Sequence, residues 1–428
     1  MRRIVRENAL CAFLAVCGCA AMAWLGLTGF AWSDYETEAQ PAFAALTDGH
    51  VLEFLRLVPA YGGSLIERAP FALIPGLWGG GALAVYRAVA APCLLATAVL
   101  GVWLLARMRG VGSPRLARAL TLGICVANPL TLRALEVGHP EELLGACLCI
   151  AAVLLAAGRS PGRARPLLAG ALLGLAIANK EWALLAAGPV LLALAPGRRL
   201  RCLASAAIAA ALVLVPLALV SSGGFLASTR AAAAPSASVI FQPWQLWWFF
   251  GHHGAPVHGL FGTAKPGYRV AAEWAGAVSH PLVLLAGLTI AASLWPRARR
   301  RALSEQDALL ALALASLLRC LLDTWDTSYY TLPFLLALLA WEVSGQPRRP
   351  PVLALACTVL AWISFQWLPE HATADLQSAA FLAWSVPLAA WLGWRLFGVG
   401  HRAHAPQPPA GAGYDTTVSS LGRLVSTS

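Results

Sequence analysis

Charged residues are scarce in this sequence of 428 residues, in which only 12% are Asp, Glu, Lys or Arg and 59% are hydrophobic. A soluble globular domain carries roughly twice that charged fraction. Lysine is rarer still, since the chain holds only Lys180 and Lys265. Apolar runs recur along the whole length and exclude a separate large soluble domain. We expect one integral membrane domain over residues 1–400 and a disordered cytoplasmic tail over 401–428, which is rich in Pro, Gly and Ser.

The sequence also lacks the patterns of a nucleic-acid-binding or metal-binding protein. Its net charge of +11 comes almost entirely from Arg in small groups between apolar runs, which is the pattern of cytoplasmic loops between membrane helices. The ten cysteines fall inside apolar runs without metal-ligand spacing, and we interpret them as packing residues. We therefore predict no cofactor and no nucleic-acid partner. The outer acidic residues leave a divalent metal open, although no ligand spacing demands one.

The first apolar stretch allows two interpretations. Arg2, Arg3 and Arg6 followed by apolar residues resemble a secretory signal. However, the stretch from Ala9 to Trp32 is longer than the apolar core of a signal peptide, which spans about 7–15 residues. We favour a retained first membrane helix.

Hydropathy predicts an all-α polytopic membrane protein of about 12 helices (10–13), because a membrane-spanning helix needs about 20 apolar residues. Two of the candidate spans are short, and we expect them to form a broken or re-entrant pair around residues 179–182. The candidate spans are 9–31, 82–106, 117–134, 141–157, 167–179, 183–196, 202–222, 281–296, 305–322, 329–343, 351–368 and 377–397.

Charge asymmetry predicts the orientation of these helices. One set of loops is short and rich in Arg, which places it and both termini on the cytoplasmic side. The opposite set contains two long segments, about 32–81 and about 223–280, with aromatic, Pro, Gly, His and acidic residues. Long ordered loops are usually functional, and we expect these two to carry short interfacial helices and the chemistry of the protein.

The first outer segment opens with the run Asp34-Tyr35-Glu36-Thr37-Glu38. Asp34 stands a few residues beyond the first predicted helix, where a carboxylate can reach both lipid headgroups and water. That position suits a general base acting on a lipid-borne substrate. The alternative is a solvated acidic loop. Asp34 and Glu36 alternate in an extended segment, so the two acids need not share a role.

A polar interruption, Asn179-Lys180-Glu181-Trp182, divides the short apolar pair. An ionisable residue within a membrane segment costs about 2.5–3.5 kcal/mol on insertion scales and is functional by default. We favour Lys180 as a phosphate ligand. Neutralisation by Glu181 is the alternative, but adjacent residues do not face each other on a helix.

Charged residues also gather between the predicted spans 117–134 and 141–157. Pro140 followed by Glu141 and Glu142 is typical of a helix start, with acids at the positive end of the dipole. That interpretation leaves Arg133 and His139 unexplained, so we keep both as candidate site residues.

The most aromatic stretch is 241–254, which includes Trp244, Trp247 and the pair His252-His253. An interfacial anchor is one interpretation, since Trp favours the membrane interface. The other is a platform for a prenyl chain or sugar ring, with a histidine near the phosphate. Adjacent imidazoles are weak evidence for metal, because a helical zinc site uses a spacing of four.

The segment after residue 305 ends in a further polar group. Arg319 and Asp323 lie four residues apart on one helix face, and we expect them to pair. Asp326 and Tyr329 follow at the outer side, where Tyr329 and Tyr330 begin the next helix.

Taken together, these motifs resemble the multi-pass glycosyltransferases of the GT-C type, and among them glycosyltransferase family 87, which contains polyprenyl-phosphate-mannose-dependent mannosyltransferases. The resemblance spans roughly residues 30–345. It rests on Asp34, on Gly138-His139-Pro140-Glu141-Glu142, on the segment 175–182 and on Asp326-Thr327-Ser328-Tyr329-Tyr330.

The resemblance implies a hexosyltransferase that moves a sugar, mannose by analogy, from a polyprenyl-phosphate donor to a lipid or glycan acceptor on the outer face of a bacterial plasma membrane. It implies inversion, with Asp34 as base and Glu36 as a second catalytic acid. Lys180, Arg133, His252 and Arg319 would bind the donor phosphate. The substrate-binding residues would be His139, Glu142, Trp244, Trp247, Asp326 and Tyr329. A transporter or flippase is the alternative function; the sequence lacks the matching pair of broken helices expected of one.

Overall fold

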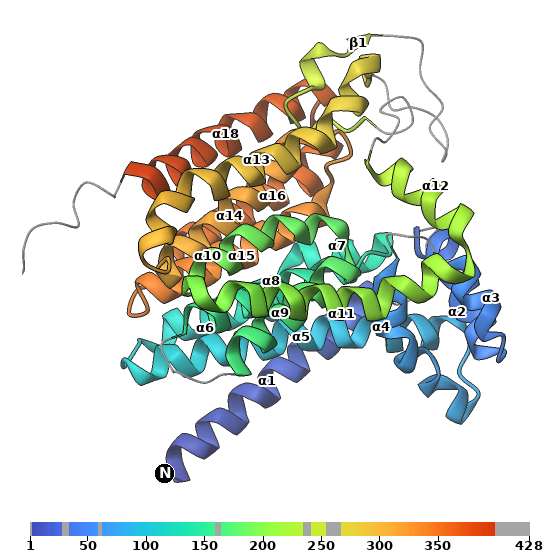
Figure 1. Ribbon diagram of the computed structural model, residues 1–428, viewed down its shortest axis with the longest axis horizontal. Coiled ribbons are helices and arrows are strands. Elements are labelled where there is room, and N and C mark those ends of the chain that lie inside the picture. The colour runs from blue at the N-terminus through green and yellow to red at the C-terminus, as the bar shows by residue number, and fades with distance from the viewer. Residues whose placement is uncertain are drawn as a thin grey trace, which may run out of the picture.

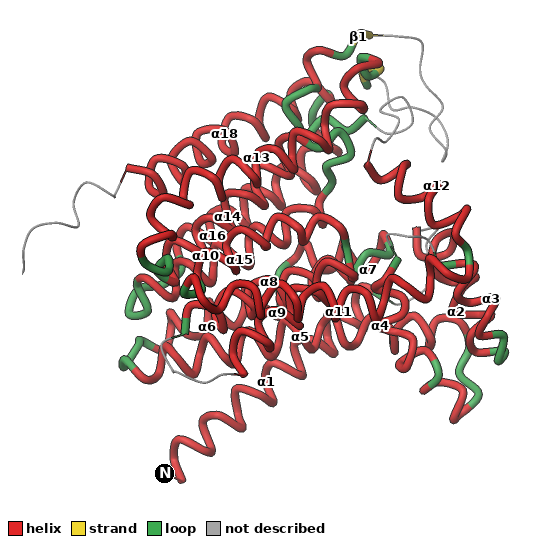
Figure 2. Tube along the Cα trace, viewed as in Figure 1, coloured by secondary structure: helices red, strands yellow, loops and turns green. Residues whose placement is uncertain are grey.

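A computed structural model describes residues 2–27, 34–58, 62–158, 164–233, 241–253 and 267–398. The predicted tail, 401–428, and parts of both long outer segments lie outside these residues. The described chain is almost entirely helical, which confirms the all-α membrane fold (Figure 1). Most of the described loops connect the ends of helices, as Figure 2 shows.

The amino-terminal half holds most of the elements that build the site. After α1 (Arg2–Gly26) comes a π-helical turn, η1 (Tyr35–Ala39), and then α2 (Gln40–Thr47), α3 (Val51–Leu57), α4 (Gly63–Ala72), η2 (Ile74–Trp78), α5 (Ala82–Gly110), α6 (Arg115–Val126), α7 (Pro129–Val137), α8 (Glu141–Ala157), α9 (Ala164–Asn179), η3 (Glu181–Ala186), α10 (Ala187–Ala193), η4 (Pro196–Arg198), α11 (Arg199–Val220) and α12 (Ser222–Ala233).

The carboxy-terminal half begins with the aromatic segment and its small hairpin. The elements are η5 (Trp248–Phe250), the antiparallel strands β1 (His252–His253) and β2 (Arg269–Val270), α13 (Glu273–Arg300), α14 (Glu305–Leu322), η6 (Ser328–Tyr330), α15 (Thr331–Gly345), α16 (Val352–Trp362), η7 (Ile363–Trp367), α17 (Leu368–His371) and α18 (Ala374–Gly398).

Seven helical segments within the described residues are long and apolar enough to cross a membrane, so the expected number of about 12 is not confirmed. These are Ala9–Gly26, Ala82–Gly110, Arg115–Val137, Pro196–Val220, Glu273–Arg300, Val352–His371 and Ala374–Gly398. The predicted span 117–134 divides into α6 and α7, because Pro129 starts a new helix that the Asn128 side chain caps at Leu130 N. The expected broken pair is present as two shorter apolar helices, Ala164–Asn179 and Glu181–Ala193.

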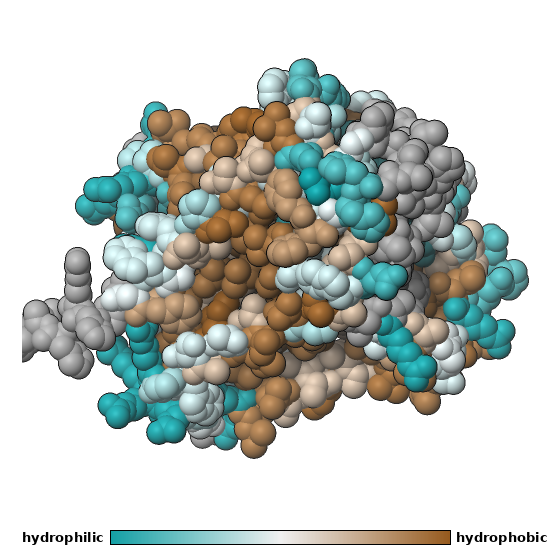
Figure 3. Space-filling view, turned by 90° about the horizontal axis from the view of Figure 1, so that it is seen from above, coloured by the Kyte–Doolittle hydropathy of each residue, from teal (hydrophilic) through white to brown (hydrophobic). Residues whose placement is uncertain are grey.

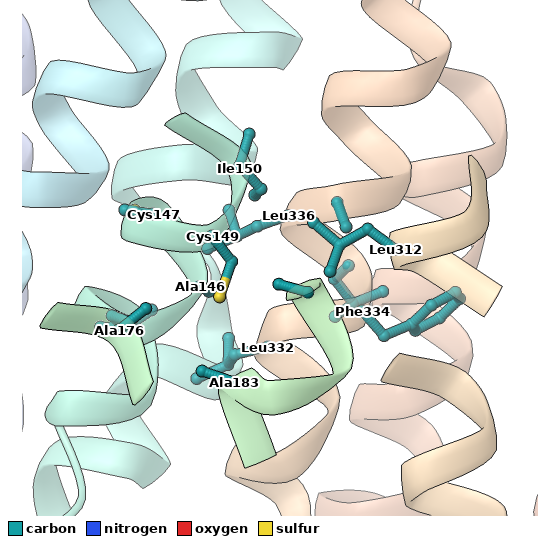
Figure 4. Packing of buried hydrophobic residues seen from close by; sticks show 14 of the residues in the cluster. Ala146, Cys147, Cys149, Ile150, Ala176, Ala183, Leu312, Leu332, Phe334 and Leu336 are labelled. Carbon is teal, nitrogen blue, oxygen red and sulfur yellow. The ribbon is translucent and has the colours of Figure 1, made fainter. Parts of the chain in front are cut away.

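The core lies where α8, α14 and α15 pack together with α9 and η3. Figure 4 shows Cys149, Ala183, Leu312, Leu332 and Phe334 within this buried layer. Cys147 and Cys149 are buried and carry no disulfide, in agreement with the packing role expected for them. Small side chains let neighbouring helices approach closely, as is usual in membrane proteins.

The surface is divided into an apolar middle and polar ends. Figure 3 shows a hydrophobic band over the middle of one face with hydrophilic patches at its ends. At one end the Arg-rich loops meet: Arg107 pairs with Glu305, and Arg348 donates to the Val111 carbonyl oxygen. The segments that build the site lie at the opposite end of α5, a helix of 29 residues and therefore roughly 43 Å long.

Candidate active site

Asp34 lies directly before the π-helical turn η1, and its neighbour Tyr35 fixes this turn to the bundle. Tyr35 is buried and stacks on Tyr86 of α5, with ring centroids 3.9 Å apart. The Tyr86 hydroxyl in turn donates to the carbonyl oxygen of Leu135 in α7. These contacts connect the start of the first outer segment to two membrane helices, so Asp34 has a defined position.

Gly138 brings the second part of the site to Asp34. It ends α7 with a φ of +108°, a conformation that favours glycine. A Cβ at this position would collide with the backbone nitrogen of Tyr35. Glycine is therefore needed both for the turn and for the close approach that puts the following residue, His139, beside Asp34.

His139 connects two carboxylates from distant parts of the chain. Its Nε2 lies 3.1 Å from Asp34 Oδ2, and its Nδ1 lies 2.8 Å from Glu141 Oε1. Burial alone would lower the pKa of His139, but Glu141 and the hydrogen bonds to both carboxylates outweigh it and raise the pKa to about 9. At neutral pH the ring is therefore an imidazolium that donates to both acids.

Glu141 contacts two cations of the site, Lys180 and Arg68. Its Oε1 lies 3.4 Å from Lys180 Nζ, and its Oε2 lies 3.4 Å from Arg68 Nη2. Asn179, at the end of α9, donates from Nδ2 to the Glu141 carbonyl oxygen at 2.9 Å and so fixes the chain break next to Lys180. The polar interruption between α9 and η3 thus places Lys180 beside Glu141. From the sequence, Glu181 was the alternative partner of Lys180.

Arg68 was not singled out by its sequence context. It lies on α4, where Nε donates to the Ser64 carbonyl oxygen at 3.1 Å and Nη2 to Ser64 Oγ at 3.3 Å. Gly63, at the start of α4, lies so close to the carbonyl oxygen of Ala178 that a Cβ would collide with it. This contact sets α4 against the end of α9 and places Arg68 beside Lys180 and Glu141.

These groups surround an open pocket. Its lining residues come from the first outer segment, from the α7–α8 turn and from the α9–η3 break: Asp34, Tyr35, Glu38, Ala39, Gly62, Ser64, Leu65, Arg68, Gly138, His139, Glu141 and Lys180. Burial raises the pKa of Glu38, although His139 and Lys180 oppose the shift. The pocket therefore combines a partly exposed carboxylate, Asp34, with a more deeply buried group of cations.

Glu142 and Arg319 form a second charged layer behind the pocket. Both Glu142 oxygens accept hydrogen bonds from Arg319 at 3.1 Å, and both side chains are buried. The rings of Trp182 and Tyr330 cover the guanidinium at 4.9 and 3.9 Å. The expected pairing of Arg319 with Asp323 is wrong.

Asp323 instead lies 3.2 Å from His280 Nε2 of α13. Helix α14 ends at Leu322, so Asp323 does not continue the helix face that carries Arg319. The Arg319 guanidinium pairs with Glu142 on α8 instead. The Tyr329 ring lies against His139 with ring centroids 4.4 Å apart and the two planes tilted by 32°. Asp326 is fully buried, and neither of its carboxylate oxygens has a hydrogen-bond partner among the described residues.

The remaining predicted site residues lie outside the pocket lining. Arg133 is exposed and pairs with Glu136 one turn along α7, and His252 is exposed on strand β1. The aromatic segment contributes packing: Trp244 Nε1 donates to the Ser364 carbonyl oxygen and Trp247 Nε1 to that of Leu322. Of the two alternating acids after Asp34, the pocket lining includes Glu38 and does not include Glu36.

Sequence reasoning missed Arg68, Glu38 and Tyr35. One signal was available for Arg68, since only two arginines, Arg56 and Arg68, stand in the outer segment 32–81, where the positive-inside rule leaves few. Among the described residues no group of three or more His, Cys, Asp or Glu side chains is arranged to hold a metal ion.

The fold and the pocket define a polytopic membrane protein with a charged site at one end of its helix bundle. The family model of glycosyltransferase family 87 matches residues 63–324, which include Arg68, His139, Glu141, Lys180 and Arg319. The chain therefore belongs to glycosyltransferase family 87 and is a membrane glycosyltransferase. Comparison with curated proteins finds no match to the chain.

Proposed function

We propose that this glycosyltransferase moves a hexose, mannose by analogy with the family, from a polyprenyl-phosphate donor to a hydroxyl of a lipid or glycan acceptor. The single observation that carries the proposal is the contact between Asp34 and His139 at the pocket. A carboxylate that is held by an imidazolium and still 28% exposed can meet an incoming hydroxyl group.

In the proposed reaction, Asp34 accepts the proton of the acceptor hydroxyl. The hydroxyl oxygen attacks the anomeric carbon of the sugar, the bond from that carbon to the phosphate oxygen breaks, and polyprenyl phosphate leaves. A single displacement of this kind inverts the anomeric centre. His139 orients the Asp34 carboxylate, and Glu141 in turn orients His139 through Nδ1.

The leaving phosphate develops charge that a cation can stabilise. Of the four cationic residues nominated from the sequence, Lys180 lines the pocket, while Arg133, His252 and Arg319 do not. Arg319 is in addition occupied by Glu142. These contacts support Lys180 as a ligand of the donor phosphate, acting from the deep side of the pocket.

We also propose that the pocket faces the outer side of a bacterial plasma membrane, with both termini in the cytoplasm. The Arg-rich loops gather at the opposite end of α5, and cytoplasmic loops are the ones enriched in Arg. A lipid-linked donor would then be reached from the membrane itself, which fits a chain that has little mass outside its helices. Because the family is one of glycosyltransferases, it favours this enzyme over the transporter alternative.

The test uses membranes that contain the protein, given radiolabelled polyprenyl-phosphate mannose and a lipid extract as acceptor source. Asp34→Asn should lower transfer at least 10²-fold, because general base catalysis contributes about 10²–10⁴-fold. Asp48→Asn, the same change at an exposed position of the same outer segment, should retain full transfer.

Full activity of Asp34→Asn would refute the assignment of the base. Absence of transfer by the unaltered protein with this donor, but presence with another polyprenyl-phosphate hexose, would refute mannose and retain the reaction.

A further inference from the structure

We propose that Arg68 is a second ligand of the donor phosphate, binding one of its oxygens through Nη1 while Lys180 binds from the other side. This inference rests on the proposed function and extends it to a residue that the sequence motifs leave out. The ligand it requires is a phosphate group carried on a lipid.

Arg68 is a buried arginine with an unused donor. Its side chain is 2% exposed, and Nε and Nη2 are satisfied by Ser64 and Glu141. Nη1, in contrast, is buried and has no hydrogen-bond partner among the described residues. Leaving a buried charged donor unmet is costly, so such a group usually has a partner, which here would be a water molecule or a bound ligand.

The position of Arg68 agrees with a ligand on the pocket side. It lines the same pocket as Asp34 and Lys180. Its separation from Glu141, 3.4 Å, is longer than the 2.7–2.9 Å of a strong charge-assisted hydrogen bond. Lys180 lies at the same 3.4 Å from Glu141. Glu141 contacts the two cations through different oxygens, and Arg68 still has its Nη1 donor for an anion.

The charges of the pocket point to an anionic ligand. Arg68, Lys180 and the protonated His139 give three positive charges, against the carboxylates of Asp34 and Glu141. Burial raises the pKa of the remaining acid, Glu38. The cations of the pocket can bind a phosphate diester, which carries one negative charge. Arg is well suited to it, because its planar donors match phosphate oxygens.

The alternative is that Arg68 only neutralises Glu141. The two roles separate in Arg68→Lys, which keeps a cation beside Glu141 but lacks Nη1. A neutralising role predicts that this variant binds the lipid phosphate normally. A ligand role predicts a loss in binding that Arg68→Gln makes larger.

The experiment measures binding to purified protein in lipid nanodiscs, on an Asp34→Asn background so that no turnover occurs. The probes are polyprenyl monophosphate, the uncharged polyprenol of the same length and a phosphatidate of matched charge. Arg68→Gln should weaken polyprenyl phosphate binding at least tenfold and leave polyprenol binding unchanged. Arg68→Lys should fall between, and Arg56→Gln, at an exposed position on α3, should bind like the parent.

The inference would be overturned if Arg68→Lys and Arg68→Gln were folded and bound polyprenyl phosphate as tightly as the parent. Size-exclusion profiles and thermal unfolding establish that each variant is folded. Equal, Arg68-dependent binding of phosphatidate would also overturn it, since the site would then serve phospholipid headgroups. Because the readout is binding, it is separable from the proposed reaction: the base assignment can fail in the transfer assay while Arg68 is upheld here, and the reverse.

Discussion

His139 Nε2 lies 3.1 Å from Asp34 Oδ2, although 105 residues separate the two in the chain. The same ring contacts Glu141 through its other nitrogen, so a carboxylate, an imidazolium and a second carboxylate form a continuous chain from the pocket to the bundle interior. This row of three side chains orients the carboxylate of Asp34. Substitution of its members should therefore change the stability and the transfer activity of the protein.

The first prediction concerns pH. The pKa of His139 is about 9, above its unfolded value of about 6.5. The resulting stabilisation is fully present below pH 6.5 and is lost as the pH rises through 9, and its upper limit is roughly 3 kcal/mol. Thermal unfolding between pH 6 and 9.5 should show this loss in the parent and a flatter profile in His139→Gln. His50→Gln, at a histidine that is 66% exposed, is the control and should follow the parent.

The second prediction concerns Gly138. Alanine there must adopt a φ of +108° and also meet the backbone of Tyr35, so both the turn and its close approach are disturbed. We expect a loss of stability above about 2 kcal/mol together with loss of transfer. Gly49→Ala is the matched control, since Gly49 has a φ of +84° but no atom within 4 Å of its added Cβ. Similar effects of the two changes would mean that the contact with Tyr35 has no role.

The third prediction compares two ion pairs. Glu142 and Arg319 are buried, so removing either partner alone should cost about 3–5 kcal/mol, because an uncompensated charge remains. Arg107 and Glu305 pair at the Arg-rich end with 39% and 21% exposure, and removing either should cost less than about 1 kcal/mol. Double-mutant cycles of thermal unfolding measure both couplings, and equal couplings would contradict this account.

The fourth prediction concerns Glu67. Burial raises its pKa to about 8, with Arg68 opposing the shift, and its Oε1 has no hydrogen-bond partner among the described residues. Because the raised pKa belongs to an acid, stability should fall as the pH rises from about 4.5 to 8.

Glu67→Gln removes this fall, and at pH 8 we expect its midpoint of thermal unfolding to exceed that of the parent by roughly 2–4 °C. Glu53→Gln, at a side chain that is 60% exposed, should change little. A lower midpoint in Glu67→Gln than in the parent would show that the ionised acid has a partner.

Much of the fold and part of the site could be read before the structure. Apolar runs predict a helical membrane protein, and the local motifs around Asp34, His139 and Lys180 lead to the family that the comparison then confirms. The number of spans is not confirmed, because α8 and α15 are apolar but have only 17 and 15 residues, and α14 has 18 residues with charged side chains in its first and last turns. Hydropathy measures composition, and it does not distinguish burial in protein from burial in lipid.

The sequence by itself determined the helical membrane class, the family and the residues that stand at breaks between apolar runs, because each of these depends on neighbours along the chain. Only the tertiary structure decided which charges meet: Arg319 with Glu142 rather than Asp323, Lys180 with Glu141 rather than Glu181, and Arg68 at the pocket. Electrostatic partners are chosen by distance in space, and that distance is set here by helix packing, including the close approaches at Gly63 and Gly138 that no local pattern encodes.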